Sequence, residues 1–470
     1  MLQKSECKNV LIIGAGNAGK LLEKDIKKHH PLLRVVGFVD DKIQIKGKVV
    51  GKIDAIPRLL HTYKVDEIII AIPSTDGSLV RKIVLLNLKN RIPIKMIPRS
   101  QEVVTKNTVS YGKVKDLETE DFLGRPFIRD NVEQLKSFYK GKTIFITGGA
   151  GSIGSEIVFQ LLDLDVKKVV VYDNSEYLIF LLEQNLKERG QLERCDLIVG
   201  NILYEHKLLA LLKKIKPDIV FHVAAYKHVH LMNDNIDQAI YNNVVGTKRI
   251  IDATIEAKVK LFTFISTDKV VNPTSVMGAT KKICEFYIKN IKSKDTQFNI
   301  VRFGNVINSN GSALPLFERQ MRLHRYITVT HRKMMRFFMS IREAAQLVIK
   351  STSQGNTSGS IYILNMGELI NIYEVAECLV RSKNLIPGED VEMRITGLLK
   401  GEKMFEELYT ETEKGKISRG SMKDIFLLKN LDECPEDIVE FIAELEEKVK
   451  NNASATTLKK DLRRLFPSIR

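Results

Sequence analysis

A polar, ionisable quartet, Ser266-Thr267-Asp268-Lys269, directly follows the apolar stretch 261–265. If that stretch is a strand of an open α/β sheet, the quartet lies at the carboxyl end of the strand, where such sheets bind their ligands. On its own, the quartet would be interpreted as a simple turn with a capping aspartate. It does not stand alone, because Met277-Gly-Ala-Thr-Lys281 begins a predicted helix soon after it. We therefore predict a site at this edge of the sheet.

A glycine-rich loop, Thr147-Gly-Gly-Ala-Gly-Ser-Ile-Gly154, follows the predicted strand at 142–146 and opens a predicted helix. Glycines let the backbone turn tightly and approach a pyrophosphate, and the helix N-terminus adds a partial positive charge. The next strand-like stretch ends in Asp173, at roughly the spacing of an acid that binds a ribose hydroxyl and repels a 2′-phosphate. These residues favour NAD over NADP, although Asn174 and Ser175 would also suit NADP.

Alternating strands and helices are predicted around both features. Apolar, β-branched stretches predict strands at 168–172, 196–199, 219–222, 261–265 and 299–303, with helices such as 205–214 and 238–257 between them. This alternation predicts a parallel sheet with right-handed crossovers. A smaller unit precedes it, with strands at 10–13, 35–39 and 68–72. Its loop, which contains Gly14, Gly16 and Gly19, either binds a nucleotide or only shapes the turn.

We therefore expect an α/β chain with two Rossmann-like doubly wound parallel sheets, the second with a C-terminal substrate-binding subdomain. The small Rossmann-like domain is predicted over 1–100 and a connector over 101–140. The catalytic domain is predicted over 141–430, with its substrate-binding part mainly after 304, and a helical tail over 431–470.

Composition narrows the classes of partner. The net charge of the 470 residues is +16, but Lys and Arg are spread along the chain and there is no Trp, which argues against nucleic-acid binding. A field that attracts a diphosphate substrate or an anionic membrane surface explains the charge as well, and so does an AT-rich coding genome. The five cysteines form no CxxC pair, so no metal site is expected. Since no signal peptide or membrane-spanning run is visible, we expect a cytoplasmic protein, with peripheral association at the inner membrane face as an alternative.

Two of these features resemble a known family. Thr147–Gly154 resembles the TGxxGxxG loop of extended short-chain dehydrogenases, whose usual catalytic pair is a tyrosine four residues before a lysine. This chain has Lys281 but carries Met277 in the tyrosine position. Ser266–Lys281 resembles the pattern STDKAVNPTNVMGASK of the UDP-N-acetylglucosamine 4,6-dehydratases, the CapD-like polysaccharide-biosynthesis proteins. Further similar blocks lie at 224–229, 242–247, 301–306 and 397–408, and the match spans about residues 1–425.

The resemblance implies a dehydration with internal hydride transfer. Enzyme-bound NAD(P)⁺ takes hydride from sugar C4, water leaves across C5 and C6, and the hydride returns to C6 to give a 4-keto-6-deoxy sugar. Thr267 would relay the proton of the 4-hydroxyl, and Asp268 would be the acid for the departing hydroxyl if burial raises its pKa. Lys269 would be the base at C5 if its pKa is lowered. Lys281 would hold the nicotinamide ribose, and Met277 cannot exchange a proton.

The resemblance also implies the two binding sets. Arg336 is the candidate for the diphosphate, with a salt bridge as its alternative role, and for His228 a structural role is equally open. The predicted cofactor-binding residues are Gly148, Gly151, Ser152, Ile153, Gly154, Asp173, Asn201, Ile202, Ala224, Ala225 and Lys281. The predicted substrate-binding residues are Lys227, His228, Asn305, Ser312, Arg336 and Glu402.

The chain departs from the family pattern around these sets. Its residues 227–233 carry His230 and Asn233 where the family has proline and glutamate, and Asn201 replaces an aspartate. Leu399 replaces an arginine, and residues 308–312 also differ. These changes put the sugar in doubt. Most family members carry transmembrane helices ahead of the first domain, and this chain starts at that domain, either as a natural short form or as a trimmed one.

Two other functions remain open at this point. One is a UDP-sugar 4-epimerase, which shares the first hydride step but normally keeps the tyrosine. The other is a non-catalytic cofactor-binding scaffold in glycan assembly, suggested by His230, Asn233 and Leu399. A homo-oligomer is expected from the family alone.

Overall fold

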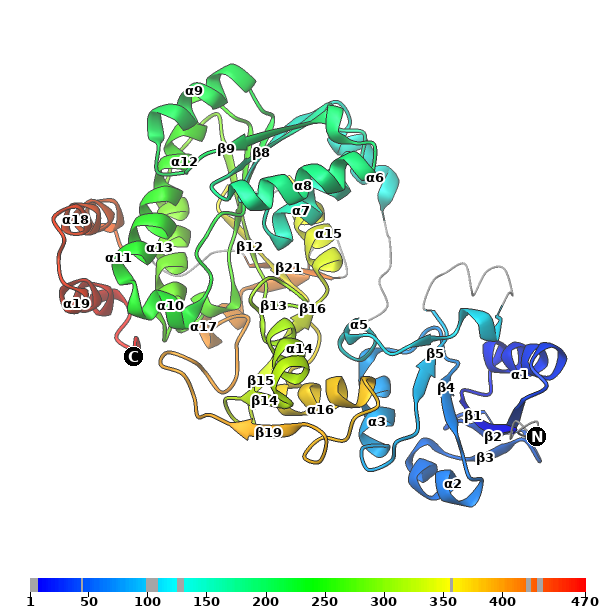
Figure 1. Ribbon diagram of the computed structural model, residues 1–470. Helices are drawn as coiled ribbons and strands as arrows, with labels where there is room; N and C mark the ends of the chain where they lie inside the picture. Colours follow the sequence, from blue (N-terminus) through cyan, green and yellow to red (C-terminus); the bar gives the residue numbers. More distant parts are fainter. Residues whose placement is uncertain are drawn as a thin grey trace. The chain divides into compact units, whose positions relative to one another are not determined.

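The computed structural model describes residues 7–43, 45–98, 109–124, 131–355, 358–419, 424–428 and 434–470. The chain forms two compact units (Figure 1). Unit 1 comprises residues 1–128, 313–334 and 370–397, and unit 2 comprises residues 129–312, 335–369 and 398–470. The segments 313–334 and 370–397, predicted within the catalytic domain, thus cluster with the N-terminal unit.

Unit 1 contains a six-stranded sheet in the order β3-β2-β1-β4-β5-β6. Its first five strands are parallel, and β6 pairs antiparallel with β5, so the predicted connector contributes a strand. The strands are β1 (Lys8–Ile13), β2 (Leu33–Val39), β3 (Val49–Gly51), β4 (Glu67–Ile70), β5 (Ile94–Met96) and β6 (Lys115–Asp116). The helices of this part are α1 (Asn17–His29), α2 (Ile56–Thr62), α3 (Gly77–Leu86) and α5 (Thr119–Leu123).

Two later segments complete unit 1. They form α14 (Ala313–His324), α16 (Ile372–Ser382), the short strand β18 (Ile370–Asn371), and a parallel pair of strands, β14 (Tyr326–Val329) and β19 (Glu392–Ile395). Helix α16 packs against α3, α5 and α14. Its buried stripe, which includes Val375, Ala376 and Leu379, explains this contact because an amphipathic helix must cover its apolar face.

Unit 2 contains a nine-stranded sheet in the order β20-β21-β17-β12-β11-β10-β7-β8-β9. The seven strands from β17 to β9 are parallel, and β21 pairs antiparallel with both β17 and β20. The strands are β7 (Thr143–Thr147), β8 (Lys168–Asp173), β9 (Cys195–Val199), β10 (Ile219–His222), β11 (Leu261–Ile265), β12 (Gln297–Arg302), β17 (Ser360–Leu364), β20 (Ile417–Arg419) and β21 (Ile425–Leu428). The chain reverses direction of winding between β7 and β10, which is the switch point where doubly wound sheets bind ligands.

Helices cover both faces of this sheet (Figure 1). Alternate residues along each strand enter different cores: Phe145 and Val170 pack on one face, whereas Ile144 and Val169 pack on the other. The helices and turns are α6 (Val132–Tyr139), α7 (Ser152–Leu162), α8 (Glu176–Glu188), α9 (Glu205–Ile215), α10 (Val229–Asp234), α11 (Ile236–Ala239), α12 (Gly246–Glu256), η5 (Asp268–Val270), α13 (Val276–Asn290), α15 (Ile341–Thr352), α17 (Glu411–Lys414), α18 (Ile438–Lys450) and α19 (Ala455–Leu465). The α/β prediction with two Rossmann-like sheets is confirmed.

Two predicted helices differ in detail. The helix expected over 238–257 is α11, a π-helical stretch at Ile240–Val245, and then α12. The tail forms two helices rather than one, and both contact α13 (Figure 1). Beyond residue 304 the expected short elements appear as β13 (Asn305–Val306), β15 (Met335–Arg336) and β16 (Phe338–Met339). Among the described residues, no helix is long and apolar enough to cross a membrane.

Candidate active site

The glycine loop after β7 is shaped by close backbone contacts. Gly148 has φ +66°, and a Cβ there would lie 2.6 Å from the backbone nitrogen of Ala224. A Cβ on Gly154 would lie 2.2 Å from the Gly148 carbonyl oxygen. Gly151 precedes α7 and has no side chain to cap it, and the nearest atom to a Cβ there is 3.4 Å away. The loop therefore exposes the N-terminal end of α7 to a ligand, as a pyrophosphate requires.

Other predicted cofactor residues surround this loop. Asp173 ends β8, and its carboxylate accepts hydrogen bonds from the backbone of Ala150 (3.1 Å) and Ser175 (3.0 Å). The Asn201 side chain accepts a hydrogen bond from the backbone of Leu203 at 2.9 Å. Ile153 and Ile202 pack into the cores, and Ala224 and Ala225 follow β10. A glycine cradle beside a fixed carboxylate fits the pyrophosphate and ribose of a dinucleotide.

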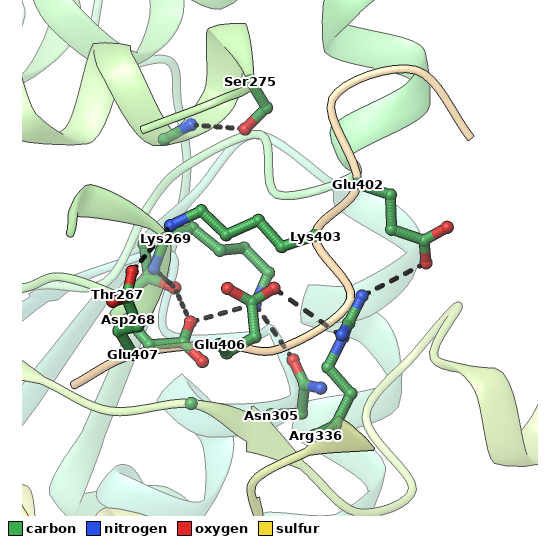
Figure 2. Close-up of polar contacts among 12 residues, drawn as sticks. Thr267, Asp268, Lys269, Ser275, Asn305, Arg336, Glu402, Lys403, Glu406 and Glu407 are labelled. Carbon is green, nitrogen blue, oxygen red and sulfur yellow. Dashed lines mark hydrogen bonds and ion pairs between the residues drawn. The ribbon is translucent and has the colours of Figure 1, made fainter. Parts of the chain in front are cut away.

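The quartet lies at the carboxyl end of β11, as expected. Parallel pairing continues past the strand, because the backbone of Asp268 donates to the Phe303 carbonyl at 3.0 Å. Thr267 Oγ1 donates to Asp268 Oδ1 at 2.9 Å. Lys269 Nζ donates to the same Asp268 oxygen at 2.9 Å and to Asn305 Oδ1 at 3.1 Å (Figure 2). The hydroxyl, carboxyl and amine groups are therefore directly connected.

A second layer of charge comes from the 398–408 segment (Figure 2). Glu406 Oε1 lies 3.7 Å from Lys269 Nζ and 3.7 Å from Arg336 Nε. Arg336 Nη2 lies 3.4 Å from Glu402 Oε1, so its guanidinium joins both glutamates. Asp268 is fully buried, and Arg336 and Glu406 are nearly so. Arg336 is therefore an interior ion-pair residue, and it could bind a diphosphate only by exchanging these partners.

The pKa shifts in this cluster have identifiable causes. Burial acts to lower the pKa of Lys269, but Asp268 and Glu406 outweigh it, and the pKa of Lys269 is raised. Burial, with Asp268 adding to it, raises the pKa of Glu406. Lys269 is thus an ammonium in this state, and the lowered pKa that a lysine base needs is not present.

Met277 and Lys281 lie on α13, which contacts η5, the turn that contains Asp268 and Lys269. Met277 is buried in the core and 4% exposed. Lys281 Nζ donates to the Ile265 carbonyl at 2.8 Å, and burial lowers the pKa of Lys281 to about 8. Lys281 is thus fixed at the end of β11, one helical turn from the methionine that stands in the tyrosine position.

The other predicted substrate residues form a separate group: Lys227 and His228 follow β10, and Ser312 ends the 308–312 loop. A Cβ on Gly311 would lie 2.4 Å from the His228 ring, so this histidine packs under the 308–312 loop. Burial lowers the pKa values of Lys227 and His228. Ser312 Oγ is buried without a hydrogen-bond partner among the described residues. The same loop reaches the glycine cradle, because the Asn310 backbone donates to Ser152 Oγ at 3.0 Å.

The sequence analysis did not predict the roles of two residues at this site. Glu406 received no role, although its block was recognised and the adjacent acids Glu406 and Glu407 were a visible signal. Asn233, noted only as a departure, accepts from the Val276 backbone at 3.0 Å and donates to the Lys400 carbonyl at 2.6 Å. It therefore ties the start of α13 to the segment that carries Glu406.

Comparisons with known proteins show which families this chain is similar to. A sequence model of the polysaccharide biosynthesis protein family matches residues 144–430, and one described as a CoA-binding domain matches residues 2–98. Probable polysaccharide biosynthesis protein EpsC of Bacillus subtilis is 36% identical over 423 residues, which cover 88% of this chain and 70% of that protein. Capsular polysaccharide biosynthesis protein CapD of Staphylococcus aureus is 33% identical over 451 residues, covering 92% and 75%.

Two further matches cover a smaller share of this chain. A UDP-glucose 4-epimerase of Rickettsia rickettsii is 29% identical over 283 residues, covering 58% of this chain and 80% of that protein. Among solved structures, Pen from Bacillus thuringiensis matches with a TM-score of 0.57 and 34% identity, covering 62% of this chain and 90% of Pen.

Proposed function

The chain belongs to the polysaccharide biosynthesis protein family, and we propose that it catalyses NAD(P)-dependent 4,6-dehydration of a UDP-N-acetylhexosamine. UDP-N-acetylglucosamine is the first candidate substrate, and a UDP-4-keto-6-deoxy sugar for a surface polysaccharide or other glycan would be the product. The observation that carries the proposal is the connected cluster of Thr267, Asp268 and Lys269 beside a buried Met277.

Met277 directs the choice of reaction. A thioether cannot exchange a proton, so the acid and base of the reaction must lie elsewhere. The end of β11 offers a carboxyl and an amine 2.9 Å apart, and elimination needs one acid and one base on the C5–C6 edge of the sugar. A simple dehydrogenase or epimerase needs no such second pair.

The cofactor set supports a nicotinamide dinucleotide. When bound, it would take a hydride from sugar C4 and return it to C6. Gly148, Gly151 and Gly154 would accommodate the pyrophosphate, Asp173 the adenosine ribose and Lys281 the nicotinamide ribose. The carboxylate of Asp173 favours NAD, since it would repel a 2′-phosphate.

Thr267, Asp268 and Lys269 would divide the proton transfers. Thr267 Oγ1 would receive the 4-hydroxyl proton and pass it to Asp268 Oδ1, to which it already donates at 2.9 Å. Asp268 would then protonate the departing C6 hydroxyl. Lys269 Nζ, once neutral, would remove the C5 proton, which the 4-ketone has made acidic.

The substrate would contact two groups of residues. The sugar and diphosphate would lie against Asn305, Arg336 and Glu402. The second group, near the 308–312 loop, consists of Lys227, His228 and Ser312. A cytoplasmic location, with peripheral membrane association as its alternative, and a homo-oligomer remain predictions.

The test is an NMR assay of the full chain with NAD⁺ and a panel of UDP-hexoses in deuterated water. We expect a C6 methyl signal from UDP-N-acetylglucosamine, with solvent deuterium at C5. Absence of a methyl signal with every UDP-hexose, at saturating substrate and with bound NAD⁺, would refute the dehydratase.

A UDP-sugar 4-epimerase is the second candidate, favoured by the similarity to the Rickettsia enzyme. In the same assay an epimerase inverts C4, leaves C6 hydroxylated and incorporates no deuterium at C5. That outcome would replace the first proposal.

A further inference from the structure

Lys269 lies between two carboxyl groups from different segments (Figure 2). Its Nζ is 2.9 Å from Asp268 Oδ1 and 3.7 Å from Glu406 Oε1. The other oxygens, Asp268 Oδ2 and Glu406 Oε2, are buried without hydrogen-bond partners among the residues that the structure describes. An ionised carboxylate oxygen without a donor is costly in the interior, and a proton on the carboxyl reduces that cost. The Glu406 carboxyl group, whose pKa is raised by burial and by Asp268, is therefore suited to hold an additional proton.

The proposed elimination has an unmet requirement in this cluster. Lys269 must be a neutral amine to accept the C5 proton, whereas the two carboxylates hold it as an ammonium by raising its pKa against the effect of burial. A proton must therefore leave Lys269 before the C5 step, and Glu406 Oε1, on a side chain that is only 4% exposed, lies 3.7 Å from Nζ as a nearby acceptor.

We propose that Glu406 is a positioning residue of the elimination: its carboxylate takes the proton from Lys269 Nζ and thereby frees the amine to remove the C5 proton. This inference rests on the proposed 4,6-dehydration. It assigns Glu406 a proton-accepting role in addition to its ion pair with Arg336.

The protons balance in this scheme. Oxidation at C4 releases the hydroxyl proton, which Thr267 passes to Asp268. Neutral Asp268 no longer stabilises the ammonium, so Lys269 gives its proton to Glu406 Oε1. The amine then takes the C5 proton, while Asp268 protonates the C6 hydroxyl, which leaves as water. After hydride returns to C6, Lys269 reprotonates C5, and Glu406 gives its proton back to Lys269.

The neighbouring groups leave Glu406 as the acceptor. Asn305 Oδ1 accepts a hydrogen bond from Lys269 but cannot take a proton near neutral pH. Glu402 pairs with Arg336, and Glu407 pairs with Lys403 at 3.4 Å. Lys269, Arg336 and Lys403 all act to lower the pKa of Glu406, but burial and Asp268 outweigh them, and the pKa is raised. Shortening the Lys269–Glu406 distance by roughly 0.7 Å would bring it to hydrogen-bond length.

The pH profile of Glu406→Gln distinguishes this role from a structural one. In the wild type, transfer from Lys269 to Glu406 leaves the number of bound protons unchanged, so kcat should be flat around neutral pH. In Glu406→Gln the proton must go to solvent, so kcat at pH 7 should fall by about 100-fold. It should then rise about tenfold per pH unit until Lys269 is neutral. Glu406→Asp should keep the flat profile at a lower rate.

Glu407→Gln is the matched control. It removes the same charge one residue away, from a side chain that is 51% exposed and pairs with Lys403 instead of Lys269. We expect its pH profile and kcat to match the wild type. A flat profile for Glu406→Gln, at any rate, would overturn the proposal, because a structural defect lowers kcat equally at every pH.

A readout without substrate separates this inference from the proposed function. Methyl acetimidate labels only neutral amines, and peptide mass spectrometry gives the labelling rate of Lys269 at each pH. Glu406→Gln should shift the labelling midpoint to lower pH, and Glu407→Gln should not. If no UDP-hexose is dehydrated, the proposed function fails, but this shift still reports the coupling. Equal midpoints in both variants would overturn the inference even in an active enzyme.

Discussion

Arg302→Met should strongly destabilise unit 2, because Arg302 neutralises two carboxylates inside the protein. Arg302 is fully buried at the end of β12. Its guanidinium donates to Glu285 at 2.8 and 2.7 Å and to Glu413 at 3.0 Å. Glu285 also accepts from Ser266 Oγ at 2.7 Å, so this network supports the residue that precedes Thr267. Methionine would leave both carboxylates buried without their main partner.

The magnitude follows from the pKa of Glu285. Burial acts to raise it, but Arg302 and Lys282 outweigh burial and lower it from 4.5 to about 2. A shift of this size corresponds to about 3 kcal/mol, within the ~3–5 kcal/mol typical of breaking a buried ion pair. Because the folded-state pKa is depressed, this stabilisation is fully present above pH 4.5 and is lost as pH falls toward 2. The difference in the free energy of unfolding between wild type and variant should therefore become smaller below pH 4.5.

Urea unfolding followed by circular dichroism at pH 7, 5 and 4 measures this gap. Arg302→Met should lose about 3–5 kcal/mol at pH 7. A triple variant that adds Glu285→Gln and Glu413→Gln should recover part of the loss, because the two buried carboxylates that Arg302 neutralised are then gone. A loss below about 1 kcal/mol at pH 7, or a gap that widens as pH falls, would refute the reasoning.

Three further variants test the site. In Gly304→Ala the new Cβ would lie 2.9 Å from Asp268 Oδ2 and would displace this carboxyl group. We therefore expect kcat in the NMR assay to fall about tenfold or more, with the affinity for NAD⁺ unchanged. Full activity would show that Asp268 need not be held in this position. Asp173→Asn should lower the preference for NAD over NADP in calorimetric titrations, and an unchanged ratio would contradict the ribose-binding role. Burial lowers the pKa of Lys281 to about 8, so between pH 8 and 10.5 this side chain is neutral in the folded protein but protonated in the unfolded chain, and it should add about 3 kcal/mol to the free energy of unfolding over this range. In urea titrations the rise should be smaller by this amount in Lys281→Met, and an equal rise in both proteins would be evidence against a buried lysine.

Local signals predicted most of the scaffold. The five strands β8 to β12 were predicted to within two residues, because continuous β-branched stretches form parallel strands buried on both faces, whereas β17, β20 and β21 of the same sheet were not predicted. Gly148 and Gly154 were identified because a tight loop before a helix requires glycine. In the structure, a Cβ on either residue would lie only 2.6 or 2.2 Å from a backbone atom, so no larger residue fits. The strand β6, the π-helical stretch and the break between α18 and α19 were not predicted, since packing against neighbouring elements outweighs weak local preference.

The sequence by itself determined the chemistry available at the end of β11: Thr267, Asp268 and Lys269 are adjacent in the chain, and a strand end must present them together. Only the tertiary structure decided their electrostatic state. Glu406 contacts Lys269, and Arg336 contacts Glu406, from segments distant in sequence, and neither spacing nor periodicity encodes such contacts. A pKa depends on every charge and on the burial around a group, so the sequence could name the candidate base but could not show that two carboxylates hold it protonated.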